Sequence, residues 1–193
     1  MISLKGQFLV AMPEMGDPRF RDAVVYMVGH GDDEGAMGLV VNQRLDDMKF
    51  ADILEELKLG SADEIIRLPD DVRDREVLRG GPVQRSRGFV LHSSDYFRED
   101  NSYSVSDDIC LTATLDILRA IAFKNAPSDA LFALGYCGWS PGQLENEIKG
   151  NGWLTVPFSR DLLFETPVGQ RYEAALGVLG ITRASLSGVA GRA

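Results

Sequence analysis

The residue best placed to do chemistry is Cys137, which follows the apolar run 130–136 and precedes a sharp turn. Such a run, ended by glycine, is typical of a strand buried on both faces. The order Gly135-Tyr136-Cys137-Gly138 echoes part of a nucleophile elbow, but Trp139 stands where the closing glycine belongs. No neighbouring residue in the sequence supplies the base that a nucleophile needs. We therefore interpret Cys137 as a small residue packed beneath a turn.

A second candidate for acid–base chemistry is His92, which ends an apolar strand and precedes Ser93, Ser94 and Asp95. Catalytic triads are assembled from distant segments, and neighbours along a chain rarely point at one another. A histidine hydrogen-bonded at the end of a strand is therefore the preferred interpretation. A cysteine-dependent enzyme that pairs His92 with Cys137 stays open as an alternative, and we assign no catalytic residue.

The residues after Cys137 indicate the start of a helix. Ser140 is suited to the N-cap, Pro141 to the first helical position and Gln143 to closing a capping box. Backbone N–H groups at such a start are unpaired and attract anions. Leu144 and Ile148 share the predicted buried face of this helix.

One region has a local excess of positive charge, with six arginines and four acidic residues between Arg67 and Arg87. In its middle, Gly80-Gly81-Pro82-Val83 separates two short predicted strands. Arg85 and Arg87 are suited to binding a carboxylate or phosphate in bidentate fashion. A small anionic metabolite held by this loop and the Ser140 helix start is therefore an alternative ligand. The simpler interpretation is a glycine turn with solvated arginines.

Metal and cofactor sites are not indicated. His30 is followed by Asp32, Asp33 and Glu34, but three acids on a hairpin loop are more typical of a solvated tip. Two cysteines and two histidines make neither a disulfide framework nor a zinc signature. We predict no metal and no cofactor.

The elements that position these residues are short. Helices are predicted at 50–57, at 115–124, from Ser140 and from Thr166-Pro167 to about Leu179, and 61–74 is predicted to be a long loop. Strands are predicted at 7–11, 23–28, 37–42, 77–78, 89–91, 103–105, 109–111, 130–136, 153–157 and 162–164. The strands and helices do not alternate regularly, so an α+β fold with mixed or mostly antiparallel sheets is favoured.

Composition describes an acidic globular protein. A chain of 193 residues suits a single domain, predicted for 1–181, with a flexible tail at 182–193. The net charge of −9 disfavours broad affinity for phosphate backbones or anionic membranes. No apolar stretch approaches the length of a membrane span or a secretory segment, so we expect a cytoplasmic protein without a membrane partner.

Three segments together resemble the YqgE/AlgH family of bacterial proteins. The sequence GYCGWSPGQLENEI, followed by GWLTVP, matches the family's hallmark from Gly135 to Ile148 and again at Trp153 and Leu154. RGGPVQRSRGFVLHSS matches a second block, and QFLVAMPEMGDPRF with GAMGLVVN matches the opening block. The family commonly has alanine at the position of Cys137, so thiol chemistry is not implied as a shared function.

The resemblance implies a single α+β domain with curled sheets, and it carries no established activity. Some members are labelled transcriptional regulators, after a link to the control of alginate production. The acidic chain and the lack of a basic helix face argue against direct nucleic-acid binding, since 115–124 carries only Arg119 and Lys124.

The favoured hypothesis is therefore a regulatory or interaction protein that acts through another protein. Its predicted surface brings Gly80–Val83 beside Tyr136–Glu145, with Tyr136 or Trp139 partly exposed. The candidate residues for a ligand or partner are Gly80, Gly81, Pro82, Arg87, His92, Tyr136, Cys137, Gly138, Trp139, Gln143 and Glu145.

Overall fold

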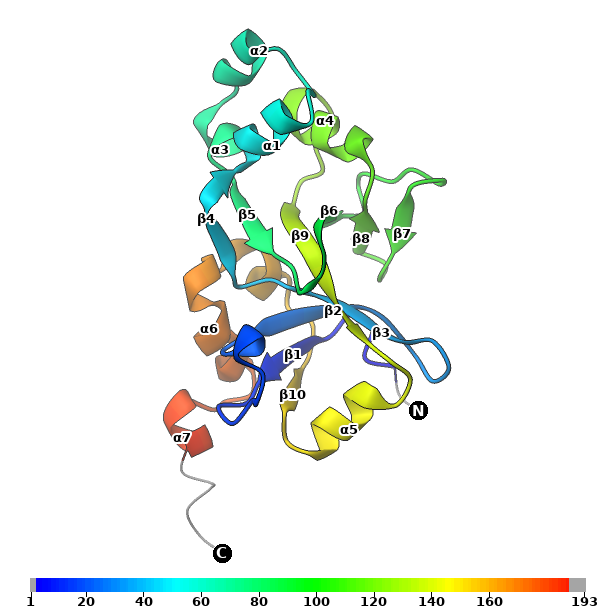
Figure 1. Cartoon of the computed structure of the whole chain (residues 1–193), viewed down its shortest axis with the longest axis vertical. Helices are drawn as coiled ribbons and strands as arrows, with labels where there is room; N and C mark the ends of the chain where they lie inside the picture. Colours follow the sequence, from blue (N-terminus) through cyan, green and yellow to red (C-terminus); the bar gives the residue numbers. More distant parts are fainter. Residues whose placement is uncertain (1–2, 188–193) are drawn as a thin grey trace, which may run out of the picture. The chain divides into compact units, whose positions relative to one another are not determined.

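A computed structural model describes residues 3–187, and their contacts divide the chain into two compact units (Figure 1). Unit 1 contains Met1–Gln43, Gly80–Val83 and Tyr136–Ala193, and unit 2 contains Arg44–Arg79 and Gln84–Gly135. Strand β9 (Ala130–Trp139) contributes its first half to unit 2 and its second half to unit 1.

Unit 1 is built on an antiparallel sheet in the order β10-β1-β2-β3-β9. The strands other than β9 are β1 (Phe8–Ala11), β2 (Val24–Gly31), β3 (Gly35–Val40) and β10 (Trp153–Val156). Strand β1 and the first half of β2 are buried on both faces, which explains their continuous apolar sequences.

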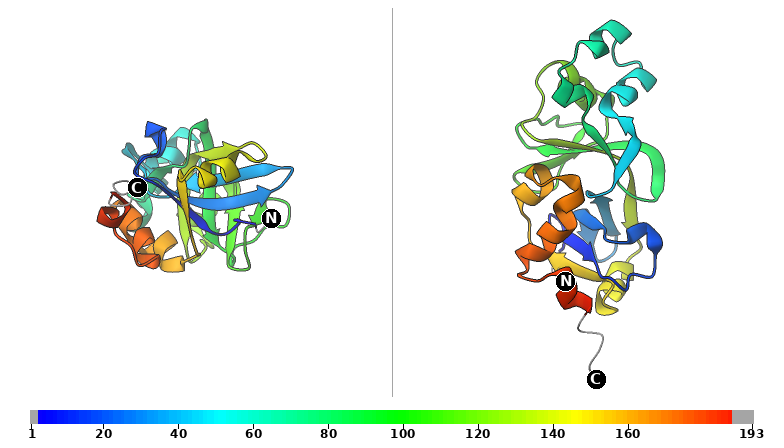
Figure 2. Two further views of the ribbon diagram at one scale, coloured as in Figure 1. Left: turned by 90° about the horizontal axis from the view of Figure 1, so that it is seen from below. Right: turned by 90° about the vertical axis from the view of Figure 1, so that its left-hand side faces the viewer.

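Helices cover both faces of this sheet (Figures 1 and 2). Leu144 of α5 (Gln143–Lys149) packs with Leu9, Val25 and the two tryptophans on one face. On the other face, Phe158 stacks against Phe8, and α6 (Arg171–Val178) contacts β1, β2 and β10.

Short helical turns complete unit 1. They are η1 (Pro18–Phe20), η2 (Asp161–Glu165), η3 (Val168–Gln170) and α7 (Arg183–Ser187). The strand predicted at 162–164 is wrong, because these residues form the π-helix η2 with Leu162 and Leu163 buried. In α7, Arg183 pairs with Asp22 and Glu173. The tail prediction for 188–193 lies outside the described residues.

Unit 2 holds a mixed sheet. Strand β5 (Glu76–Arg79) pairs parallel with β9 and antiparallel with β4 (Arg44–Lys49). On the other side of β9 the order continues through β6 (Val83–Ser93), β8 (Ile109–Thr112) and β7 (Ser102–Ser104). Strand β4 was not predicted, because its sequence RLDDMK is largely polar and exposed.

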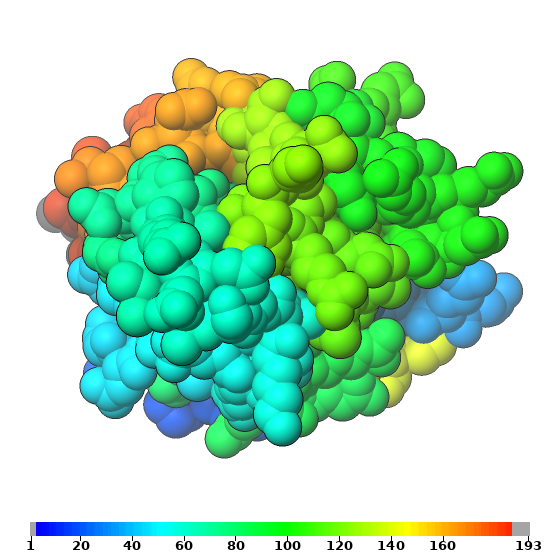
Figure 3. Space-filling model, turned by 90° about the horizontal axis from the view of Figure 1, so that it is seen from above, coloured from blue at the N-terminus to red at the C-terminus, as the bar shows by residue number. Residues whose placement is uncertain are grey.

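Helices α1 (Phe50–Glu56) and α4 (Leu115–Phe123) close the core of unit 2. Two shorter helices, α2 (Ala62–Ile66) and α3 (Asp70–Arg73), occupy the segment predicted to be a loop. That prediction is wrong because helices of five and four residues are too short to show a repeating apolar pattern. The space-filling view shows this helical segment, in cyan to teal, against the yellow-green α4 segment (Figure 3).

The core of unit 2 comprises buried residues from all these elements: Phe50, Ile53, Leu54, Leu59, Ile65, Leu68, Val77, Val90, Tyr96, Ile117, Leu118, Ile121, Ala122 and Phe132. The α+β prediction is confirmed, and the four predicted helices correspond to α1, α4, α5 and α6. In the part of the chain that the structure describes, no helix has the length and hydrophobicity needed to span a bilayer.

Candidate functional site

Glu147 organises the hallmark segment of unit 1. Its Oε2 accepts hydrogen bonds from Trp139 Nε1 at 2.9 Å and Trp153 Nε1 at 2.7 Å, and its Oε1 accepts one from Gln143 Nε2 at 2.9 Å. The two indole rings meet edge to face, with centroids 6.0 Å apart. This arrangement, the Glu147 clamp, fastens α5 to β9 and β10. It gives both buried indole N–H groups the partner they require.

His30 forms a second link between the sheet and α5. Its Nδ1 accepts a hydrogen bond from the Leu4 backbone N–H at 2.9 Å, so the ring proton is on Nε2, which donates to Glu145 Oε1 at 2.6 Å. This bond holds the pKa of Glu145 below its ordinary value. Asp32, Asp33 and Glu34 are exposed, as a solvated hairpin tip predicts.

The histidine itself is not part of that tip, since its side chain is 3% exposed and both ring nitrogens are engaged. Across residues 3–187, no group of three or more histidine, cysteine or acidic side chains is placed to hold a metal ion.

Gly80–Val83 lies beside the end of β9, as predicted. A Cβ atom on Gly81 would come within 2.2 Å of the Tyr136 carbonyl carbon and oxygen. Gly80 O accepts hydrogen bonds from the Val40 backbone N–H at 2.8 Å and from Cys137 Sγ at 3.4 Å. Gly81 is therefore required for close backbone packing.

Of the two aromatic side chains predicted as alternatives for partial exposure, Tyr136 is the one that is partly exposed. Pro82, Val83 and Tyr136 are half-buried and Gly138 is exposed, but Trp139 is only 6% exposed and belongs to the core. The use of this surface by a partner stays a prediction.

Cys137 is a buried thiol. Burial raises its pKa to about 12, so the sulfur is protonated at neutral pH. A nucleophilic cysteine needs the opposite, a depressed pKa beside a base. The environment of Cys137 within unit 1 therefore favours packing over reactivity.

His92 is fully buried in unit 2, and both ring nitrogens have partners. Nδ1 lies 2.9 Å from the Ser93 carbonyl oxygen, which can only accept, so Nδ1 carries the proton. Nε2 then accepts from Thr112 Oγ1 at 2.8 Å, and Ser102 Oγ, also 2.8 Å from that oxygen, donates to it. Burial lowers the His92 pKa, so the ring is neutral and serves a local network. Its pairing with Cys137 gains no support from the surroundings of either residue.

Helix α5 begins later in the chain than the predicted N-cap at Ser140. The helix begins at Gln143, with Gly142 at the N-cap and a positive φ of 76°. Ser140 and Pro141 form a preceding turn, and the Ser140 backbone N–H donates to Gln143 Oε1 at 3.1 Å. Only this half of the predicted capping box is present, because the turn inserts Gly142 before the helix.

The two arginines proposed as anion ligands, Arg85 and Arg87, are exposed residues of unit 2. Arg87 packs over the Phe89 ring at 5.3 Å, and its Nη1 donates to Gln84 Oε1 at 3.3 Å. Ser140 belongs to unit 1. The anionic-metabolite hypothesis therefore stays a prediction without a specific observation in its favour.

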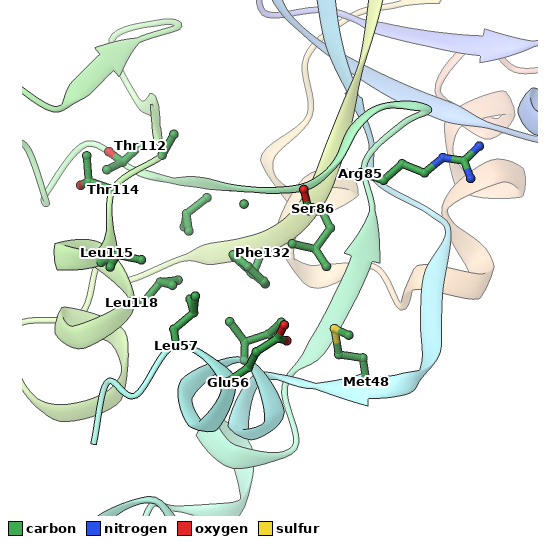
Figure 4. Close-up of a pocket in the computed structure, with 15 residues that line it drawn as sticks. Met48, Glu56, Leu57, Arg85, Ser86, Thr112, Thr114, Leu115, Leu118 and Phe132 are labelled. Carbon is green, nitrogen blue, oxygen red and sulfur yellow. The ribbon is translucent and has the colours of Figure 1, made fainter. Parts of the chain in front are cut away.

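Unit 2 contains an open apolar cavity of about 380 Å³, a site that the sequence did not predict (Figure 4). Its walls come from β4, α1, β6, β9, the β8–α4 connection and α4. The lining residues are Met48, Ile53, Glu56, Leu57, Arg85, Ser86, Gly88, Val90, Thr112, Ala113, Thr114, Leu115, Leu118, Phe132 and Leu134. Leu57 and Leu115 at the rim remain 42% and 48% exposed, so the opening is itself apolar.

Two charged side chains line this cavity. Figure 4 shows the Glu56 carboxylate reaching toward the cavity between Leu57 and Met48, whereas the Arg85 guanidinium extends away from the apolar walls. The charge that faces the cavity is therefore negative.

Comparison with known proteins covers nearly the whole chain. A sequence profile described as AlgH-like matches residues 8–184. A UPF0301 protein from Mesorhizobium japonicum is 55% identical over 190 residues, covering 98% of this chain and 93% of the relative. A second, from a Methylobacterium species, is 50% identical over 190 residues and covers 98% of this chain and 90% of its own. The chain belongs to the AlgH-like family.

Two solved structures resemble this chain along most of its length. The solution structure of the AlgH protein from Pseudomonas aeruginosa has a TM-score of 0.78 at 39% identity, covering 99% of this chain and 96% of that one. A Corynebacterium diphtheriae protein, 19% identical, has a TM-score of 0.63 over 83% of this chain and 78% of its own, which shows a shared fold.

The motif residues that this chain shares with the AlgH-like family make specific contacts in the structure. Trp139, Gln143, Glu147 and Trp153 hold α5 against the sheet, and Gly81 permits close packing. The RGFVLH block contributes differently, because its Gly88 and Val90 line the apolar cavity.

Proposed function

We propose that this AlgH-like protein is a regulatory or interaction protein that binds a protein partner, and that the cavity of unit 2 receives the partner's apolar side chains. The observation that carries this proposal is the apolar cavity with half-exposed leucines at its rim. Its volume lies within the range of ligand sites in proteins, roughly 300–1,000 Å³. Exposed apolar surface around a cavity is typical of a site that a partner covers.

The chemistry of the candidate residues supports binding over catalysis. The thiol of Cys137 is protonated, and the imidazole of His92 is enclosed by its own hydrogen bonds. Neither supplies the activated nucleophile that covalent catalysis needs.

Charge supports a protein partner over nucleic acid. The net charge is −9, and helix α1 contains Asp52, Glu55 and Glu56 but no lysine or arginine. A regulatory effect on transcription would on this proposal pass through a cytoplasmic protein and not through contact with DNA.

Site-specific cross-linking tests the proposal. A photoreactive amino acid replaces Leu115 at the cavity rim in cells, and a matched one replaces Ile66, which is also exposed and in unit 2 but does not line the cavity. We expect one defined partner cross-linked from position 115 and not from 66. Its capture should be lost with Leu115→Asp and kept with Ile66→Asp. Equal cross-linking from both positions, or none, would contradict the proposed site.

A further inference from the structure

The chemistry of the cavity identifies the kind of segment that fits it. Resting on the function proposed above, we infer that the partner segment is amphipathic and cationic: two or three neighbouring apolar side chains enter the cavity, and an adjacent lysine or arginine pairs with Glu56.

The apolar requirement follows from the walls. Ile53, Val90, Leu118 and Phe132 are buried core residues that also line the cavity. A cavity of about 380 Å³ has the space of roughly a dozen water molecules. That is more than one side chain fills, so an occupant presents several apolar groups from one face, as amphipathic peptides do in apolar grooves.

The basic requirement follows from the charge at the opening. Glu56 is the acidic side chain among the lining residues, and its carboxylate reaches toward the cavity. Arg85, the only cation among the lining residues, extends away from the walls. A cationic group beside the inserted apolar side chains therefore complements this rim, whereas an acidic group meets like charge.

The ion pair gains strength from its surroundings. Apolar side chains that cover Glu56 exclude water from one side of its carboxylate, and a lower local dielectric strengthens attraction to a cation. The same covering makes an unpaired Glu56 unfavourable, which selects against partners without a basic residue.

A display library of random 16-residue peptides tests this inference. Peptides are selected on the full-length protein and counter-selected on Ala113→Trp, in which a large side chain fills the cavity from an exposed lining position. Ser86→Trp blocks the cavity from strand β6 and replaces the first variant if that one does not fold.

We expect the retained peptides to combine clustered leucine, methionine or phenylalanine with lysine or arginine. For a retained peptide, Glu56→Gln should weaken binding about two- to fivefold, the range of a half-exposed ion pair, and should reduce its dependence on salt. Glu55→Gln is the matched control on the same helix and should leave both unchanged.

The alternatives are separable. Cavity-dependent peptides that are neutral or acidic, or an equal effect of the two substitutions, overturn the cationic partner and leave the proposed function standing. An empty selection also overturns this inference, and the cross-linking from position 115 then decides the proposed function by itself.

Discussion

The Glu147 clamp of unit 1 and the cavity of unit 2 use apolar side chains in opposite ways. In unit 1 two tryptophans are buried against each other, and their polar atoms meet one carboxylate. In unit 2 two leucines stay half-exposed around an open space. The comparison separates residues that define the fold from residues that are free to serve binding. Substitution of a fold-defining motif residue should lower the free energy of unfolding. Substitution of a rim residue should weaken partner binding and leave the stability nearly unchanged.

The largest effect is expected from Glu147→Leu. The substitution removes the acceptor of two buried indole N–H groups, each of which then costs about 1–3 kcal/mol, so we expect a loss of about 4 kcal/mol in the free energy of unfolding. Urea denaturation followed by tryptophan fluorescence measures it. Glu147→Gln, which keeps one oxygen acceptor, should lose less. Equal stability of Glu147→Leu and wild type would show that the clamp contributes nothing.

The second largest loss of stability is expected from Gly81→Ala. Its Cβ would lie 2.2 Å from the Tyr136 backbone, and the movement needed to relieve this contact costs about 3 kcal/mol. Gly169→Ala is a suitable control because a Cβ at that position would have no atom within 4 Å and its φ is not positive. Thermal unfolding of the two variants should differ clearly. Similar melting temperatures would contradict the close packing of Gly80–Val83 on β9.

Asp95 in unit 2 gives an intermediate effect that depends on pH. Hydrogen bonds from the Ser128 and Ser93 hydroxyls lower its pKa from 3.8 to about 2. A depressed pKa stabilises the folded state above the unfolded value, and this stabilisation is lost as the pH falls from about 4 to about 2. Since Asp95 is exposed, solvent screening limits its contribution to about 1 kcal/mol.

Asp95→Ala should therefore lower the free energy of unfolding by that amount at pH 7, and by progressively less as the pH falls toward 2. Urea titrations at several pH values measure the difference from wild type. A difference that stays constant across this range would exclude the ionised carboxylate as its cause.

The smallest effect on stability is expected from Leu115→Asp. The side chain is already 48% exposed, so its replacement should change the free energy of unfolding by no more than about 0.5 kcal/mol. The same variant should lose partner binding. A large loss of stability would place Leu115 with the fold-defining residues and remove the contrast between the two units.

The sequence determined the fold class, the family and most of the secondary structure. Apolar runs such as Phe8–Ala11 and periodic helices such as Leu115–Phe123 are readable because their burial repeats along the chain. The glycines at 80 and 81 also indicated a close approach of backbone, which Gly81 makes against Tyr136. Short helices α2 and α3 and the polar strand β4 escaped prediction because they lack such repetition.

Only the tertiary structure decided what the chemically capable residues do. The sequence pattern indicated a buried face only at Leu144 and Ile148 of helix α5, but His30 and two tryptophans reach Glu145 and Glu147 from other strands. Burial of Cys137 raises its pKa, and its Sγ donates to the carbonyl of Gly80 from a segment distant in sequence. The Thr112 hydroxyl that occupies His92 Nε2 also comes from another strand. The cavity also arises only in the tertiary structure, because its walls come from helices, strands and a connection that are separate in the sequence. Its volume depends on how these elements pack, and no local sequence pattern encodes that.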